Sequence, residues 1–221
     1  MNKRKLSRLM HERVGALKSW KNNYFFRDDF EYVLRGVCFD YTPRGLYIVN
    51  FRFPLFEFES FELFGGPHLS YSDRVFDHRG WGFVGKGEMS EEAIVDFVMS
   101  FRDVQSAFAP HDKLTELPDF VYYLESRPNF PPSVPPGLLR NANARLIHIA
   151  ALLLLGQESR AVSLLDDLAP VFNEYPDHPA NKRGAAFCNL LQTSLQQGLA
   201  AVRTLLDQIR QENLRRLGIA S

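Results

Sequence analysis

Cysteine is scarce in this chain of 221 residues, with only Cys38 and Cys188, which stand 150 positions apart. Two such residues do not make a disulfide framework, and no Cys/His spacing matches a zinc site, so we expect buried, reduced thiols. The chain also lacks an apolar run of the ~20 residues that a membrane-spanning helix needs, since the longest extends from Ile149 to Leu155. Its basic start is not followed by the apolar stretch of a signal peptide. These absences predict a cytoplasmic protein with no membrane association, no metal site and no cofactor.

An excess of charge of one sign is missing as well. Lys and Arg total 26, Asp and Glu total 26, and the formal net charge is zero. This balance argues against a whole-molecule attraction to nucleic acid or to an anionic membrane. Hydrophobic residues make up 45% of the chain and charged residues 24%. These are ordinary values for a folded protein, so they exclude disorder as the overall state.

The start of the chain is basic and helical in pattern. Apolar side chains recur at helical spacing over residues 3–20, which predicts an amphipathic helix. The cations on its other side are candidates for contacts with nucleic acid: Arg4, Lys5, Arg8 and Lys18. A solvated helix face is the competing interpretation, because these cations lie away from the apolar stripe.

From residue 30 to 58 the pattern changes to strands. Two segments rich in aromatic and β-branched residues flank Thr42-Pro43-Arg44-Gly45, which predicts a β-hairpin. Ten of the 19 phenylalanines lie between residues 25 and 64, more than a two-stranded ribbon can bury by itself. Most of these rings are expected in a core. Phe56 and Phe58, however, alternate with Glu57 and with Glu59, and such a strand edge can accept a partner strand.

The remaining pattern predicts an α+β fold in two parts. Ser90-Glu91-Glu92 begins a helix that extends to residue 108, and a shorter helix is expected over 118–125. Residues 127–137 contain five of the 13 prolines and predict a linker. Beyond it, helices are expected over 138–155, over 158–175 with an interruption at Pro170, and over 180–217 with a break near Gly198. The predicted domains are therefore an aromatic-rich α+β domain (1–126), the linker (127–137) and an all-helical domain (138–221).

The helical part contains the segment IHIAALLLLGQESRAVSLLDDLAPVFNEYPDHP, which begins at Ile147. With Ala150 and Gly156 near the end of its first helix and Ala161 in its second, this segment resembles a tetratricopeptide-like helical pair. A second Ala-Val pair follows 40 positions after the first, where the strict family repeats every 34 residues, and the aromatic positions of that family are missing. The resemblance implies a scaffold for protein binding.

The most polar segment of the aromatic-rich part is the first place to look for chemistry. Residues 68–81 include four candidate catalytic residues: His68, Asp73, Asp77 and His78. A His–Asp pair can act as general base and orienting group, although no nucleophile with a recognisable motif accompanies it. Structural or surface roles are the alternative interpretation. In the helical part, His148 lies in an apolar helix with Arg145 one turn earlier, which suggests a core or partner-facing histidine.

We therefore expect a non-enzymatic protein-interaction protein that acts through its helical tail and its Phe-rich sheet. Phe56, Phe58, Arg145 and His148 are the candidate partner-binding residues. This build is typical of adaptor proteins and, by analogy, of accessory or immunity-type proteins of small bacterial gene systems. The alternative is a hydrolytic or phosphate-acting enzyme with a site around His68–His78. The third hypothesis is nucleic-acid binding through the basic first helix.

Overall fold

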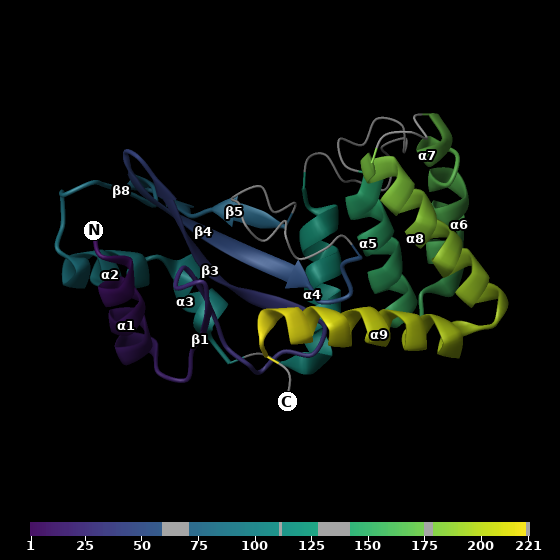
Figure 1. The fold of residues 1–221 in the computed structure, drawn as a ribbon, viewed down its shortest axis with the longest axis horizontal. Coiled ribbons are helices and arrows are strands. Elements are labelled where there is room, and N and C mark those ends of the chain that lie inside the picture. The colour runs from purple at the N-terminus through teal and green to yellow at the C-terminus, as the bar shows by residue number, and fades with distance from the viewer. Residues whose placement is uncertain (59–70, 111, 128–141, 175–178, 220–221) are drawn as a thin grey trace. The chain divides into compact units, whose positions relative to one another are not determined.

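The computed structural model describes the chain from residue 1 to 219, except residues 59–70, 111, 128–141 and 175–178. The chain is divided into two compact units (Figure 1). Unit 1 consists of Met1–Phe53 and Glu62–Lys113, and unit 2 consists of Pro54–Phe61 and Leu114–Ser221. Each unit is therefore built from two separate stretches of sequence. Compactness does not test which parts fold independently, so the predicted domains 1–126 and 138–221 stay a prediction; most of the predicted linker lies outside the described residues.

Unit 1 contains a six-stranded antiparallel sheet and a second sheet of two short strands, and this confirms the α+β prediction. The strands of the main sheet are, in the order in which they lie, β1 (Lys18–Trp20), β2 (Tyr24–Phe26), β3 (Val33–Thr42), β4 (Gly45–Pro54) and β5 (Ser72–Arg74), with β8 (Phe83–Gly85) also paired with β4. The small sheet pairs β6 (Phe76–Asp77) with β7 (Gly80–Trp81).

The predicted hairpin forms from β3 and β4. Thr42 closes its turn, because the Thr42 hydroxyl lies 3.2 Å from the backbone nitrogen of Gly45 and donates to the Gly45 carbonyl at 3.1 Å. The second strand ends at Pro54, four residues earlier than predicted. Proline has no N–H to continue a strand ladder, so the chain leaves the sheet there. Within β3, Gly36 is required by close approach, since a Cβ at this position would lie 2.0 Å from the Phe25 carbonyl oxygen of β2.

The helices of unit 1 are shorter than the sequence pattern predicts. The helix expected over residues 3–20 is wrong at its end: α1 (Lys3–Val14) stops at Gly15, whose φ of 66° favours glycine, and the following residues form β1. The helix expected over 90–108 is divided into α2 (Glu91–Met99) and α3 (Arg102–Phe108). The Gln105 side chain donates to the Met99 carbonyl at 2.8 Å, which satisfies an acceptor at the end of α2.

One core joins these helices to one face of the main sheet. Its residues are buried and come from α1, α2, α3, from the strands and from the segments next to them: Leu6, Met10, Leu17, Phe25, Val37, Phe39, Leu46, Ile48, Val75, Val84, Ile94, Val95, Val98, Phe101, Val104 and Phe108. Burying each phenylalanine stabilises the unit by about 1.5–3 kcal/mol. The helices therefore cover the Phe-rich sheet from within unit 1.

Unit 2 is helical. Its helices are α4 (Lys113–Glu125), α5 (Ala142–Leu154), α6 (Glu158–Leu168), α7 (Val171–Glu174), α8 (Pro179–Gln196) and α9 (Leu199–Leu217). The interruption at Pro170 and the break near Gly198 are confirmed, whereas α4 begins five residues before its predicted start and contains Pro118. Helix α5 is buried from Asn143 to Leu153, and it contacts α6, α8 and α9, so it is the central helix of the unit. This arrangement is compatible with a helical repeat.

The segment that follows β4 belongs to unit 2. Phe56 is fully buried, with its ring 6.4 Å from that of Phe120 in α4. The ring of Phe58 stacks on Phe187 of α8 at a centroid distance of 4.3 Å. The Asn213 side chain in α9 donates to the Leu55 carbonyl at 2.7 Å and to the Glu57 carbonyl at 2.9 Å. These buried contacts hold residues 55–58 among the helices.

Candidate functional site

An exposed pair of aromatic side chains lies on the small sheet of unit 1. Phe76 in β6 and Trp81 in β7 are direct partners across the strands, and their rings meet edge to face at 5.1 Å. The pair stays open to solvent, since Phe76 is 58% exposed and Trp81 is 60% exposed. We call residues 76–81 the aromatic hairpin. Cross-strand aromatic pairs of this kind stabilise the hairpin that carries them and so fix their own geometry.

The base of the aromatic hairpin is bonded to the main sheet. Ile48 of β4 donates its backbone N–H to the Gly82 carbonyl at 2.7 Å and accepts from the Val75 N–H at 3.0 Å. Gly82 in turn donates to the Val75 carbonyl at 2.8 Å. Val75 is 1% exposed and belongs to the core. The two strands of the hairpin therefore start from a buried, fully bonded position.

The turn of the hairpin is held by a third element. The Arg79 guanidinium donates to the Ser100 hydroxyl at 3.0 Å and lies over the ring of Phe101, 4.7 Å from its centroid. Both partners belong to the junction between α2 and α3. With its base and its turn both fixed, the hairpin presents Phe76 and Trp81 on a preorganised support.

The predicted catalytic residues are distributed over two sheets. Asp73 lies in β5 of the main sheet, where it pairs in register with Asn50 of β4. His78 is exposed in the turn of the aromatic hairpin, and Asp77 contributes its backbone to β6. His68 lies outside the described residues. Within the part of the chain that the structure describes, no group of three or more His, Cys, Asp or Glu side chains is arranged to hold a metal ion.

The predicted partner-binding residues lie inside unit 2. Phe56 and Phe58 contact its helices, as described above, and Arg145 and His148 are 2% and 0% exposed. His148 is hydrogen-bonded on both ring nitrogens: Nδ1 lies 3.2 Å from Nη1 of Arg145, and Nε2 lies 2.8 Å from Oε1 of Glu125. Arg160 of α6 forms an ion pair with the same Glu125 carboxylate. We call Glu125, Arg145, His148 and Arg160 the buried ionic cluster, after its two buried members, Arg145 and His148; Glu125 and Arg160 are partly exposed.

The geometry of this cluster determines the protonation state of His148. A guanidinium can only donate, so Nδ1 must accept from Arg145, and the proton of the neutral ring is on Nε2, where it is donated to Glu125. Burial lowers the pKa of His148 from its ordinary 6.5 to about 4; the hydrogen bond to Glu125 opposes this change and the charge of Arg145 adds to it. The arrangement connects α4, α5 and α6 and serves the structure of unit 2.

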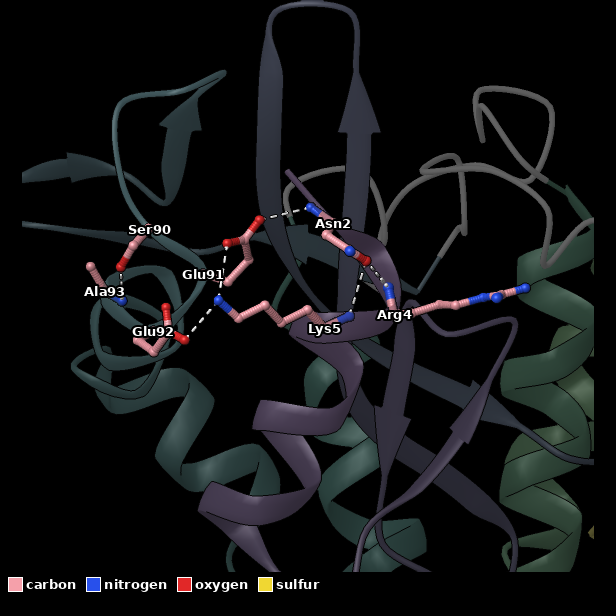
Figure 2. Close-up of polar contacts among 7 residues, drawn as sticks. All are labelled: Asn2, Arg4, Lys5, Ser90, Glu91, Glu92 and Ala93. Carbon is pink, nitrogen blue, oxygen red and sulfur yellow. Dashed lines mark hydrogen bonds and ion pairs between the residues drawn. The ribbon is translucent and has the colours of Figure 1, made fainter.

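The basic first helix is paired with acidic side chains. Figure 2 shows the Lys5 side chain beside two carboxylates of α2. Its Nζ lies 2.8 Å from the Glu92 carboxylate and 3.7 Å from that of Glu91. The Asn2 side chain caps α1 by accepting from the Arg4 and Lys5 N–H groups, and the Asn2 N–H donates to Glu91 at 2.8 Å.

Other cations proposed for nucleic acid have acidic partners too. Arg8 lies 3.5 Å from Glu12, and Lys18 lies 3.6 Å from Asp28. Arg4 is exposed. These ion pairs are on the surface and contribute little stability. The pairs of Lys5 and Arg8 nevertheless lower the positive potential of α1 that nucleic acid would have to recognise, and Lys18 lies in β1, outside this helix.

Neither the aromatic hairpin nor the buried ionic cluster was predicted from the sequence. The signal for the hairpin was a glycine-containing segment, Asp-His-Arg-Gly, between two aromatic residues. In the structure this glycine, Gly80, adopts φ 110° at the start of the second strand, a conformation that favours glycine. Only two members of the cluster could be related to each other from the sequence. Arg145 and His148 share one helix face, but Glu125 and Arg160 come from other helices and become neighbours only in the fold.

Comparison with known proteins gives no relative: no family model, no curated protein and no solved structure matches the chain. Among the described helices, none is both long and apolar enough to cross a membrane.

Proposed function

We propose that this protein is a non-enzymatic adaptor or accessory protein, and that the aromatic hairpin is the centre of its partner-binding surface. The observation that carries the proposal is the exposure of Phe76 and Trp81, at 58% and 60%, on a hairpin fixed at both ends. Large aromatic side chains supply most of the affinity at many protein interfaces. A rigid support reduces the entropy that is lost on binding.

Unit 2 carries exposed apolar side chains of its own. Two exposed side chains, Leu114 at 86% and Tyr122 at 75%, lie two turns apart on α4, and Leu190 of α8 is 50% exposed. The pairs α5–α6 and α8–α9 are in contact, as in the tetratricopeptide-like scaffold that the sequence resembles. Such scaffolds bind proteins, so this unit is proposed to contribute to partner recognition.

Protein binding has more support than the two alternatives. Three of the four cations proposed for nucleic acid are already ion-paired with carboxylates: Lys5, Arg8 and Lys18. The candidates for an enzyme site, Asp73 and His78, lie on different sheets. A hydrolytic or phosphate-acting site around His68–His78 and a nucleic-acid site on α1 both stay predictions.

The test is capture of a partner by the full chain. The tagged protein is incubated with native lysate at physiological salt, captured proteins and nucleic acids are identified, and the principal protein is then purified for a binary titration. We expect the change of both Phe76 and Trp81 to alanine to weaken that binding by at least about 30-fold, which corresponds to about 2 kcal/mol. The matched control is Met89→Ala, which removes an exposed, large apolar side chain of unit 1 outside the aromatic hairpin and should leave that binding unchanged.

Point variants are preferable to removal of residues 138–221. That deletion takes away Phe187 and Asn213, which hold the buried residues 55–58, and so it disturbs more than the proposed surface. Far-UV circular dichroism verifies that each variant is folded. If binary binding is equally strong in the Phe76/Trp81 variant and in Met89→Ala, the proposed surface is wrong. If only nucleic acid is captured, the proposed function is wrong.

A further inference from the structure

The core-facing side of the main sheet changes from apolar to polar at one end. Along β4, the alternation that places Ile48 in the core also directs Asn50 and Arg52 to the same side of the sheet. In β3, Arg35 similarly precedes the core residue Val37 by two positions. An apolar side chain at each of these positions would extend the core. Polar residues at core-facing positions are a departure from the local pattern, and such departures are concentrated at functional sites.

A cavity of about 170 Å³ lies at this polar end, between β3, β4, β5 and α3 of unit 1. Its polar lining consists of Arg35, Asn50, Arg52, Asp73, Asp103 and Ser106. The lining thus carries two cationic and two anionic side chains, so its formal charge is zero although its polarity is high. A net-neutral lining with charged groups of both signs is suited to a ligand that also carries both.

One polar atom of the lining is unsatisfied. Oδ1 of Asn50 is buried and has no hydrogen-bond partner among the residues that the structure describes. Leaving a buried acceptor unpaired is unfavourable, so a ligand that supplies a donor gains free energy here. The terminal torsion of asparagine is broad, so the amide group of Asn50 can adjust to a donor that a ligand supplies. Arg35 lines the cavity and donates to the Ala109 carbonyl at 3.3 Å, and a guanidinium carries several N–H donors that can also contact an anion.

We propose that this cavity binds a small zwitterion, an α-amino acid or a molecule of similar size and charge. The carboxylate of the ligand is placed against Arg35 and Arg52, because guanidinium groups recognise carboxylates in a bidentate way. Its ammonium group is placed against Asp73 and Asp103, with one N–H donated to Asn50. The volume equals that of about six water molecules, which is close to the size of a small amino acid.

The experiment is isothermal titration calorimetry of the full chain with glycine, L-alanine, L-serine and L-glutamine. Acetate and ethylammonium, which carry one charge each, are titrated separately. We expect saturable binding of at least one amino acid below roughly 10 mM, and binding at least about tenfold weaker for the two single-charge ions. The change Asp103→Asn should weaken the amino acid by at least about tenfold, because it removes one partner of the ammonium group.

Two further variants make the result specific. Ser106→Trp fills the cavity from α3 without removing a charge and should abolish binding. Asp28→Asn, a matched control, changes an exposed carboxylate that is paired with Lys18 away from the cavity, and it should leave binding unchanged. Circular dichroism shows whether each variant is folded. If Asp103→Asn does not fold, the binding measured with Ser106→Trp decides between the two outcomes. Absence of saturable binding by all four amino acids overturns the proposal. Equal binding of acetate or ethylammonium, or undiminished binding by the folded Ser106→Trp variant, also overturns it.

Discussion

Acid should destabilise unit 2 through one buried side chain, His148. In the folded state its Nδ1 accepts from Arg145, its Nε2 donates to Glu125, and the ring is 0% exposed. Protonation of Nδ1 breaks the bond with Arg145 and places a second positive charge beside that guanidinium. Because the folded pKa is lowered, the unfolded chain takes up this proton first, so the free energy of unfolding decreases as the pH falls.

The size of the effect follows from the two pKa values. The unfolded ring becomes protonated near pH 6.5 and the folded ring only near about pH 4. Over this window the free energy of unfolding should fall by about 3 kcal/mol, with a slope of at most about 1.4 kcal/mol per pH unit. Above pH 6.5 the contribution of His148 is fully present. Such a loss is a large fraction of the stability of an ordinary domain.

Amide hydrogen exchange of α5, measured by mass spectrometry, is the suitable assay. Both tryptophans, Trp20 and Trp81, belong to unit 1, so intrinsic tryptophan fluorescence does not report on unit 2. The variant His148→Gln keeps a donor for Glu125 and an acceptor for Arg145 but has no titrating ring. We expect its opening free energy to change by less than about 1 kcal/mol over the same pH window.

The matched control is His78→Gln, which removes an exposed histidine of unit 1 and should leave the acid sensitivity of α5 intact. Glu125, Arg145 and Arg160 are present in the wild type and in both variants, so their own responses to acid cancel in the comparison. Equal acid sensitivity of α5 in the wild type and in His148→Gln would refute the assignment of the effect to this ring.

Three further predictions concern packing and reactivity. Asn213→Ala removes the amide that donates to two buried carbonyls, so it should lower the free energy of unfolding by about 1–3 kcal/mol. Urea titrations followed by circular dichroism measure this loss, and Gln211→Ala on the exposed side of the same helix should have little effect. Gly36→Ala places a methyl group 2.0 Å from a backbone oxygen and should cost more than about 3 kcal/mol or prevent folding, as measured by expression and thermal melting; a stable variant would contradict the close approach. Burial raises the pKa of Cys38 to about 12 and that of Cys188 to about 11, so near pH 8 both thiols should react with a colorimetric thiol reagent only after unfolding, and rapid reaction of the native protein would show that they are accessible.

Local signals predicted most of the elements. The β-branched and aromatic runs on both sides of Thr42–Gly45 led to the observed hairpin, and the breaks at Pro170 and Gly198 fall between observed helices. The errors have local causes that periodicity does not reveal. Apolar spacing continues past Gly15, although its positive φ ends the helix there. Apolar spacing also continues from α2 into α3, although the backbone between them is extended at Phe101 and divides the helix.

Long-range contacts could not be predicted in this way. Phe56 and Phe58 have the alternation of a strand edge, yet their partners are Phe120 and Phe187, which follow more than sixty positions later in the sequence. The buried ionic cluster has the same character, because Glu125 reaches His148 from a different helix. Alternation and spacing report the face on which a residue lies. They do not report the element that covers that face.

The discontinuity of unit 2 has a consequence for protein synthesis. Leu55 is held by Asn213, which follows it by 158 positions. At about 5–20 residues per second, the ribosome delivers this partner roughly 8–30 s after Leu55 has been synthesised. During that interval the apolar segment 55–58 has no completed helical unit to receive it and is available to chaperones or to another nascent chain. The burial of this segment therefore depends on a helix that is synthesised long after it, and interruption of translation before α9 leaves an aggregation-prone chain.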